Sequence, residues 1–295
     1  MQTEIEKTIS DIQSIREAGD LCFVALSDTR LLDSGAQTRE RIQTLDRELH
    51  FDFLVHLGDI LRGGSPEKVS CRILREELAA YRESLGSKKL FVTQGEDDGW
   101  RDESFVGQLV TGIMRDHVWH QETAFIDKYE QTYRQGDKPY YYGDFPEQRT
   151  RLIFLCSERY EYNGPGKLFQ KYHTFGLEQL AWLKEQALQA PEGWNVLLFS
   201  HAIPDCKFET GVNPPSYKGN AMDRTFATLQ SGIRERKLHH VDWVTGHYGQ
   251  DCQARVVSLD YRSIGGPSVF VLKTEEHKLY QFPLFLPVEK DYNLQ

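Results

Sequence analysis

The chain lacks the cysteine pattern that marks disulfide scaffolds and zinc clusters. It has no C-x-x-C pair, and its five cysteines are scattered along 295 residues. An odd number of cysteines without a framework is typical of reduced thiols in a cytosolic protein. We therefore expect a cytoplasmic location, with Cys22 and Cys156 as core residues because both lie in apolar runs.

Long apolar runs are also missing. No run approaches the roughly 20 residues that a helix needs to cross a bilayer, and the opening stretch MQTEIEKTIS is too polar and acidic for a signal peptide. The net charge is −9, from 44 acidic and 35 basic residues. This balance argues against general nucleic-acid binding and against an anionic membrane as the main partner.

Strand and helix patterns alternate over the first hundred residues. The apolar run 51–57, bounded by Gly58 and Asp59, predicts a buried strand. Further strands are predicted at 21–26 and 90–93, with amphipathic helices at 3–18, 37–49 and 66–85. This order is typical of parallel βαβ units, which bring the loops after the strands to one edge of a sheet.

The rest of the chain predicts further strands and helices. An edge strand is expected to open at Pro139, and residues 157–175 are expected to form a long loop. Other strands are predicted at 151–156, 194–199 and 241–245, helices at 176–189 and 220–236, and antiparallel strands over 255–285. We expect a single domain over 21–295 with a helical insert at about 100–135, and an N-terminal helix within 1–20 packed on it.

Polar residues follow several of the predicted strands. Asp28, Asp59 and the run Glu96-Asp97-Asp98 come after the three early strands, and His201 and His247 follow two later ones. Packing so many carboxylates together is costly unless a cation or basic side chains compensate. For Asp59 alone, capping of the next turn explains the pattern equally well.

The loops after the strands form a series that resembles a known family. In order they read S-D-T-R, G-D-I-L-R, G-E-D-D, S-H-A-I-P and G-H-Y-G. This series is similar to the calcineurin-like metallophosphoesterases, whose motifs are D-x-H, G-D-x-x-D, G-N-H-[DE], a lone His and G-H-x-H. The resemblance runs from about Leu21 to Phe285 and includes PYYYGDF…RLIFLCS and FGLEQLAWLKEQAL. It implies an α/β fold, a four-layer α/β/β/α sandwich of two mixed sheets, with two divalent metals at one edge.

One of the two metal positions that the resemblance implies is complete. Its ligands match Asp59, Glu96, His201 and His247, with Glu96 replacing the family's asparagine. Carboxylate oxygens and imidazole nitrogens suit Mn, Fe, Zn or Mg. We therefore predict one divalent metal at this position. His56 is interpreted as a core histidine, or one that supports a ligand, and not as a ligand itself.

The other metal position is depleted. Asp28 matches its first aspartate and is a candidate metal ligand, but Arg30 and Gly249 replace two histidines. Arginine is always cationic and has no lone pair for a metal, so no second metal is expected. Arg62 replaces the second aspartate of G-D-x-x-D, and Asp97 replaces the histidine that helps the leaving group.

The main hypothesis is a phosphoester hydrolase, either a phosphatase or a phosphodiesterase, with an altered metal site. Arg30 and Arg62 are the predicted substrate-binding residues, because guanidinium groups bind phosphate bidentately and stabilise a phosphoryl transition state. Asp97, as a general acid, and Arg30 are the candidate catalytic residues. The expected partner is a small phosphorylated or other anionic ligand.

Two alternatives keep the fold without the chemistry. In the first, the chain is a catalytically inactive scaffold that binds anions: Arg30 pairs with the aspartates near it, and the acids at 96–98 are solvated turn residues. In the second, the aromatic segment 139–162 or the insert at 100–135 forms a surface for a protein partner.

Overall fold

The computed structural model describes most of the chain. It covers residues 4–29, 34–61, 67–95, 97–98, 118–161, 170–173, 175–203, 206–207, 216–217, 220–238, 240–247, 249, 251–256 and 259–284. Residues 100–117, half of the predicted insert at 100–135, lie outside these ranges. The architecture below is that of these residues.

Helices and strands alternate along the described chain. The helices are α1 (Glu4–Ile15), α2 (Ser34–Leu49), α3 (Glu67–Leu85), α5 (Leu177–Trp182) and α6 (Asn220–Arg236), with the helical turns η1 (Ala124–Lys128) and η2 (Leu183–Ala187). The first eight strands are β1 (Leu21–Leu26), β2 (Phe53–His56), β3 (Lys89–Val92), β4 (Thr132–Arg134), β5 (Tyr141–Phe145), β6 (Thr150–Phe154), β7 (Glu158–Glu161) and β8 (Gln170–His173). The others are β9 (Asn195–Ser200), β10 (Cys206–Lys207), β11 (Ser216–Tyr217), β12 (His240–Thr245), β13 (Cys252–Val256), β14 (Leu259–Ser263), β15 (Ser268–Lys273) and β16 (Lys278–Pro283).

Most of these elements lie within a few residues of their predicted bounds, because each has a clear apolar period. In α1, for example, the isoleucines recur at helical spacing, and Ile9 and Ile12 are buried. Two predictions are wrong. The strand after Pro139 is not at an edge, because β4 pairs with the outer side of β5. Residues 157–175 are not only a loop, because β7 and β8 pair as antiparallel strands.

The first sheet has the order β16-β15-β1-β2-β3. Its strands β1, β2 and β3 are parallel, with Phe23 of β1 in register with Phe53 of β2, while β15 and β16 join in antiparallel fashion. The loops that follow β1, β2 and β3 therefore all leave at one edge of the sheet. This edge carries the described residues of three predicted motifs: Asp28 after β1, Asp59 after β2, and Asp97 and Asp98 after β3.

The second sheet has the order β13-β14-β12-β9-β6-β5-β4. Its four central strands β14, β12, β9 and β6 are parallel, and the outer strands β13, β5 and β4 are antiparallel to their neighbours. Strands β9 and β12 lie side by side, so the histidine loops that follow them leave the sheet next to each other.

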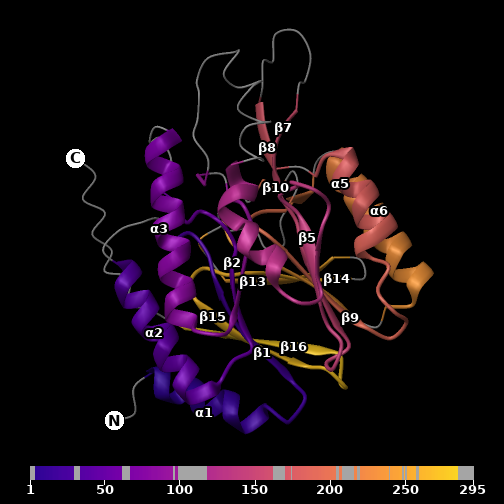
Figure 1. The fold of residues 1–295 in the computed structure, drawn as a ribbon. Coiled ribbons are helices and arrows are strands. Elements are labelled where there is room, and N and C mark those ends of the chain that lie inside the picture. The colour runs from indigo at the N-terminus through magenta and orange to yellow at the C-terminus, as the bar shows by residue number, and fades with distance from the viewer. Residues whose placement is uncertain are drawn as a thin grey trace.

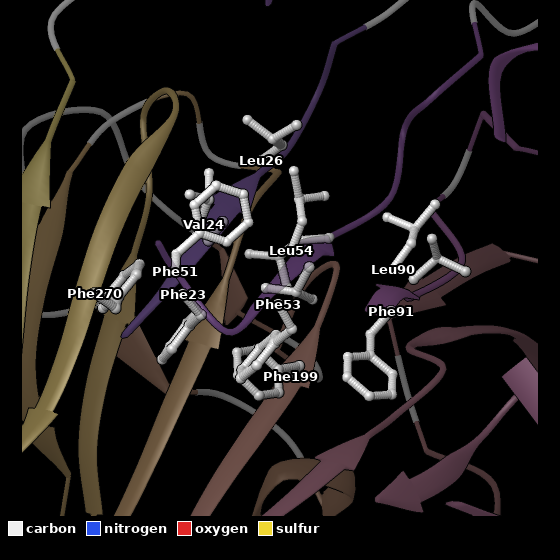
Figure 2. Packing of buried hydrophobic residues seen from close by; sticks show 14 of the residues in the cluster. Phe23, Val24, Leu26, Phe51, Phe53, Leu54, Leu90, Phe91, Phe199 and Phe270 are labelled. Carbon is white, nitrogen blue, oxygen red and sulfur yellow. The ribbon is translucent and has the colours of Figure 1, made fainter. Parts of the chain in front are cut away.

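An aromatic core fills the space between the two sheets. The rings of Phe23 and Phe53 stack at 4.8 Å in the first sheet, and Phe199 of β9 meets Phe23 edge-on at 5.7 Å. Phe91 of β3 stacks on Phe154 of β6 at 4.8 Å. Figure 2 shows these inward-facing rings around Phe23, Phe53, Phe91 and Phe199. Such pairs stabilise a core beyond the burial of their area, and here they fix one sheet against the other.

Helices cover the outer faces of both sheets. Helices α1, α2 and α3 lie on the side of the first sheet, and α5 and α6 lie on the side of the second (Figure 1). A separate apolar cluster, with Trp182, Leu229 and Trp243, fills the space beneath α5 and α6. The result is the four-layer α/β/β/α arrangement of two mixed sheets, so the predicted fold class is confirmed. Within the described chain, no helix combines the length and the apolar character needed to cross a membrane.

Candidate metal centre

Four of the predicted site residues lie just beyond the ends of parallel strands. Asp28 follows β1, Asp59 follows β2, His201 follows β9 and His247 follows β12. The backbone N–H of Gly246 donates to the carbonyl of His201 at 3.0 Å, which ties the two histidine loops together. Because Asp59 lies 3.5 Å from the ring of His201, the rims of the two sheets meet at this point.

Asp59, His201 and His247 form a compact group. Each offers one ligand atom, and these atoms all lie within 4.8 Å of one another. Nε2 of His201 lies 3.5 Å from Oδ1 of Asp59 and 3.0 Å from Nδ1 of His247. Asp59 and His201 are fully buried, while His247 is half-buried. A carboxylate and two imidazoles at this spacing are a donor set that suits a divalent metal.

The orientation of His201 is fixed from behind. Its Nδ1 lies 2.8 Å from the carbonyl oxygen of Leu57, and a carbonyl only accepts, so Nδ1 carries the proton. In the neutral ring Nε2 is then an acceptor, and it points at the carboxylate oxygen of Asp59. Nε2 of His201 can accept a hydrogen bond from Nδ1 of His247 at 3.0 Å, or it can share a cation with Asp59. Donation of the other ring N–H to a backbone carbonyl is also how metal-binding histidines are usually held.

The electrostatic surroundings of Asp59 also favour a cation at this position. Burial raises the pKa of the Asp59 carboxyl to about 7, the nearby His201 opposes this rise, and the neighbouring carboxyls of Asp98 and Asp28 add to it. The backbone N–H of Asp97 donates to Oδ1 of Asp59 at 2.9 Å, which favours the ionised form. A positive charge beside Asp59 would offset the cost of burying its carboxylate.

Asp98 organises the loops beneath this group. Its carboxylate is buried and accepts three backbone hydrogen bonds, from Asp59 at 2.9 Å, Gly95 at 2.8 Å and Leu61 at 2.9 Å. Asp98 is therefore not the solvated turn acid of the scaffold alternative. The motif G-E-D-D did not distinguish Asp98 from the acids beside it, although its place at the acidic position of G-N-H-[DE] was the available signal.

The loops approach each other more closely than side chains would allow. A Cβ atom on Gly95 would overlap the backbone nitrogen and a carboxylate oxygen of Asp59. Asp28, Asp59 and His247 all have positive φ, at 56°, 54° and 66°. This region is uncommon for residues other than glycine, and strained backbone tends to gather at functional sites.

His56 is a buried core histidine beside the group. Its Nε2 lies 2.8 Å from the hydroxyl of Thr29, and its ring meets Tyr81 edge-on at 5.8 Å. Complete burial lowers the pKa of His56 to about 3, against the opposing effect of Asp28. The ring is therefore neutral at physiological pH and supports the loop after β1.

The remaining predicted residues divide into two sets. Arg30, Arg62 and Glu96 lie outside the described residues, so their roles stay predictions. Asp97 is partly exposed, and its backbone is anchored to Asp59. Gly249 is exposed and brings no ligand to the rim.

No protein-family model matches the sequence, and no curated protein sequence matches it. Among solved structures, the chain is similar to PhoD, with a TM-score of 0.57 and 12% identity over 87% of this chain and 64% of that chain. The chain thus spans less than two thirds of the length of PhoD. A dimetal phosphatase from Danio rerio aligns with a TM-score of 0.49 and 14% identity, over 85% of this chain and 92% of that chain. The likeness to PhoD supports the fold of the calcineurin-like metallophosphoesterases for this chain.

Proposed function

We propose that the protein hydrolyses phosphoesters and uses a single divalent metal held by Asp59, His201 and His247. One observation carries this proposal: the acceptor atoms Oδ1 of Asp59 and Nε2 of His201 face each other at 3.5 Å in a buried position. Nδ1 of His247 lies 3.0 Å from the same nitrogen, so a third ligand atom is at hand.

The sequence resemblance adds a fourth ligand, Glu96. Mn, Fe, Zn or Mg are the metals that this mixture of oxygen and nitrogen ligands suits. Such a metal, when bound, supplies Lewis acidity toward a phosphoester and lowers the pKa of a coordinated water. The protein itself holds the ligand atoms in place and buries them. The carbonyl of Leu57 does this for the ring of His201.

Two arginines are proposed to bind the substrate. Arg30 replaces a histidine ligand of the family pattern, and Arg62 replaces the second aspartate of G-D-x-x-D, so each adds a positive charge to its motif. A guanidinium group holds phosphate oxygens bidentately and opposes the negative charge that develops during phosphoryl transfer. This charge would act in place of a second metal. The substrate class is accordingly a small phosphorylated molecule.

Asp97 is proposed to protonate the leaving group. Its backbone N–H donates to Oδ1 of Asp59 at 2.9 Å, which keeps position 97 next to the proposed metal. A carboxyl group at this position can give a proton to the leaving oxygen, which is the role of a general acid.

Hydrolysis of p-nitrophenyl phosphate and bis(p-nitrophenyl) phosphate tests the proposal. The purified protein is assayed with Mn, Zn, Fe(II) or Mg added singly. We expect turnover with at least one metal, and a loss of kcat/KM of about 100-fold or more in His201→Ala, because removing a ligand weakens both metal binding and catalysis. His120→Ala is the matched control, since His120 pairs with Asp127 on η1 and belongs to no part of the proposed site.

A different result would favour the scaffold alternative. A protein that turns over neither substrate with any of the four metals, and that still binds inorganic phosphate, would be an anion-binding protein with this fold. Equal activity in the wild type and in His201→Ala would also contradict the proposed site.

A further inference from the structure

The Asp28 carboxylate ties the loop after β1 to the loop after β12. Its Oδ2 accepts the backbone N–H of His247 at 2.9 Å and also accepts the hydroxyl of Ser27. A carboxylate oxygen has two lone-pair directions. Both directions of Oδ2 are therefore used by donors from the protein itself.

These bonds hold a backbone conformation that needs support. His247 has φ of 66°, in the left-handed region that a residue with a side chain rarely adopts. The N–H of His247 donates to Asp28, and the N–H of the preceding residue, Gly246, donates to the carbonyl of His201, so two successive peptide groups are held in place. The side chain is thereby directed so that Nδ1 of His247 lies 3.0 Å from Nε2 of His201.

The close approach of the two loops is built into the sequence. A Cβ atom on Gly246 would overlap the side chain of Ser27 and would lie 3.2 Å from Oδ2 of Asp28. Only glycine leaves room for the hydroxyl and the carboxylate at this point. The contact between the loops therefore depends jointly on Ser27, Asp28 and Gly246.

Asp28 does not belong to the group of facing ligand atoms. Among the described residues, that group contains Asp59, His201 and His247. Position 249, where the family pattern has a histidine, is a glycine. We infer that Asp28 is a positioning residue that orients the ligand His247 through its backbone, and that it does not itself bind the metal. The inference rests on the proposed function, because it assumes a metal on Asp59, His201 and His247.

Two variants of Asp28 separate positioning from metal binding. In Asp28→Asn the amide oxygen can still accept the N–H of His247 and the hydroxyl of Ser27, whereas Asp28→Ala removes the acceptor. Co²⁺ binding to each full-length protein is measured by calorimetry and by the visible absorption of the bound ion. We expect Asp28→Asn to keep one equivalent of Co²⁺, the wild-type spectrum and a Kd within about threefold of wild type. We expect Asp28→Ala to raise the Kd about tenfold or more, as losses of supporting hydrogen bonds do.

The opposite pattern would overturn the inference. If Asp28→Asn changes the Co²⁺ spectrum, or raises the Kd as much as Asp28→Ala does, the carboxylate is a ligand. A wild-type protein that binds no Co²⁺ would instead refute the proposed function. In that case hydrogen exchange of the His247 amide in the metal-free proteins decides the positioning role. Slow exchange in wild type and Asp28→Asn with fast exchange in Asp28→Ala supports it, and equal exchange in all three refutes it.

Discussion

The two halves of the rim contain similar residues but differ in what those residues face. In the half formed by Asp59, His201 and His247, three atoms that can bind a metal lie close together: Nε2 of His201 is 3.5 Å from Oδ1 of Asp59 and 3.0 Å from Nδ1 of His247. In the half formed by Ser27 and Asp28, the carboxylate faces an N–H and an O–H that belong to the protein. A shared cation suits the first arrangement, whereas Oδ2 of Asp28 in the second is satisfied by donors of the protein itself.

The difference teaches that residue type alone does not assign a role at this rim. Three aspartates, Asp28, Asp59 and Asp98, lie near one another, and their neighbours give them separate tasks. Asp98 accepts three backbone N–H groups and shapes the loops, Asp28 ties two loops, and Asp59 faces a histidine acceptor. The following variants test whether these tasks are as distinct as the contacts indicate.

Asp98→Ala should have the largest effect on stability. It leaves the buried N–H groups of Asp59, Gly95 and Leu61 without their acceptor, and each unpaired buried group costs about 1–3 kcal/mol. We expect the free energy of unfolding, measured by urea denaturation, to fall by about 4 kcal/mol. Asp97→Ala is the matched control, because the backbone N–H that binds Asp59 remains, and its loss should stay below about 1 kcal/mol. Equal losses in the two variants would contradict the structural role of Asp98.

Gly95→Ala should have the second largest effect on stability. Its Cβ would overlap the backbone nitrogen and the carboxylate of Asp59, so the two loops must separate. We expect a loss of about 3 kcal/mol in unfolding free energy, at the upper end for overpacked sites, together with weaker metal binding in calorimetry. Gly266→Ala is the control, because no atom lies within 4 Å of its added Cβ, and its change should stay within about 0.5 kcal/mol. A Gly95→Ala protein with wild-type metal affinity would show that the close approach does not shape the site.

The buried His56 should make stability depend on pH. The folded protein holds this ring neutral down to a pKa of about 3, whereas the unfolded chain takes up the proton near pH 6.5. Between these values the unfolded state binds more protons, so stability falls as the pH falls. From pH 7 to pH 5 the contribution of His56 should decrease by about 2 kcal/mol.

His56→Gln provides the comparison for this effect. The variant lacks the titrating ring, so its unfolding free energy should fall by about 2 kcal/mol less than that of wild type between pH 7 and pH 5. Urea denaturation of both proteins at pH 7, 6 and 5 measures the difference. Parallel pH profiles would mean that His56 takes up its proton in the folded state as readily as in the unfolded state.

Ser27→Ala should have the smallest effect. It removes one hydrogen-bond donor from Asp28 and leaves the N–H of His247 in place. We expect a loss of about 1 kcal/mol in unfolding free energy and a metal affinity within about twofold of wild type. Loss of metal binding in this variant would place the Asp28 half of the rim inside the metal site.

Much of the fold could be predicted because its signals are local. Short apolar runs and helical periods predicted most of the strands and helices. The alternation of strands with helices then predicted a sheet with parallel strands. The pairings of β4 with β5 and of β7 with β8 join segments that are close in sequence, with Arg134 opposite Tyr141 and Glu161 opposite Gln170. Strands as short as β4, Thr132–Arg134, have too few residues to show an alternating pattern of apolar and polar side chains.

The composition of the candidate site could be predicted only in part. Parallel strands bring their carboxyl ends together, so the alternation of strands and helices placed Asp28 and Asp59 at one edge, and the family resemblance added His201 and His247. The sequence could not indicate which atoms would face which, because this depends on loop backbones with positive φ at Asp28, Asp59 and His247. For the same reason the three bonds to Asp98 were not foreseen.

The most direct test of a single-metal site is a crystal structure of the protein grown with Zn²⁺, with anomalous data collected at the zinc absorption edge. The facing acceptors predict one anomalous peak, at about 2.0–2.2 Å from donor atoms of Asp59, His201 and His247, and no peak bonded to Asp28. A second peak that binds Asp28, or the absence of any peak at the three ligands, would contradict the account.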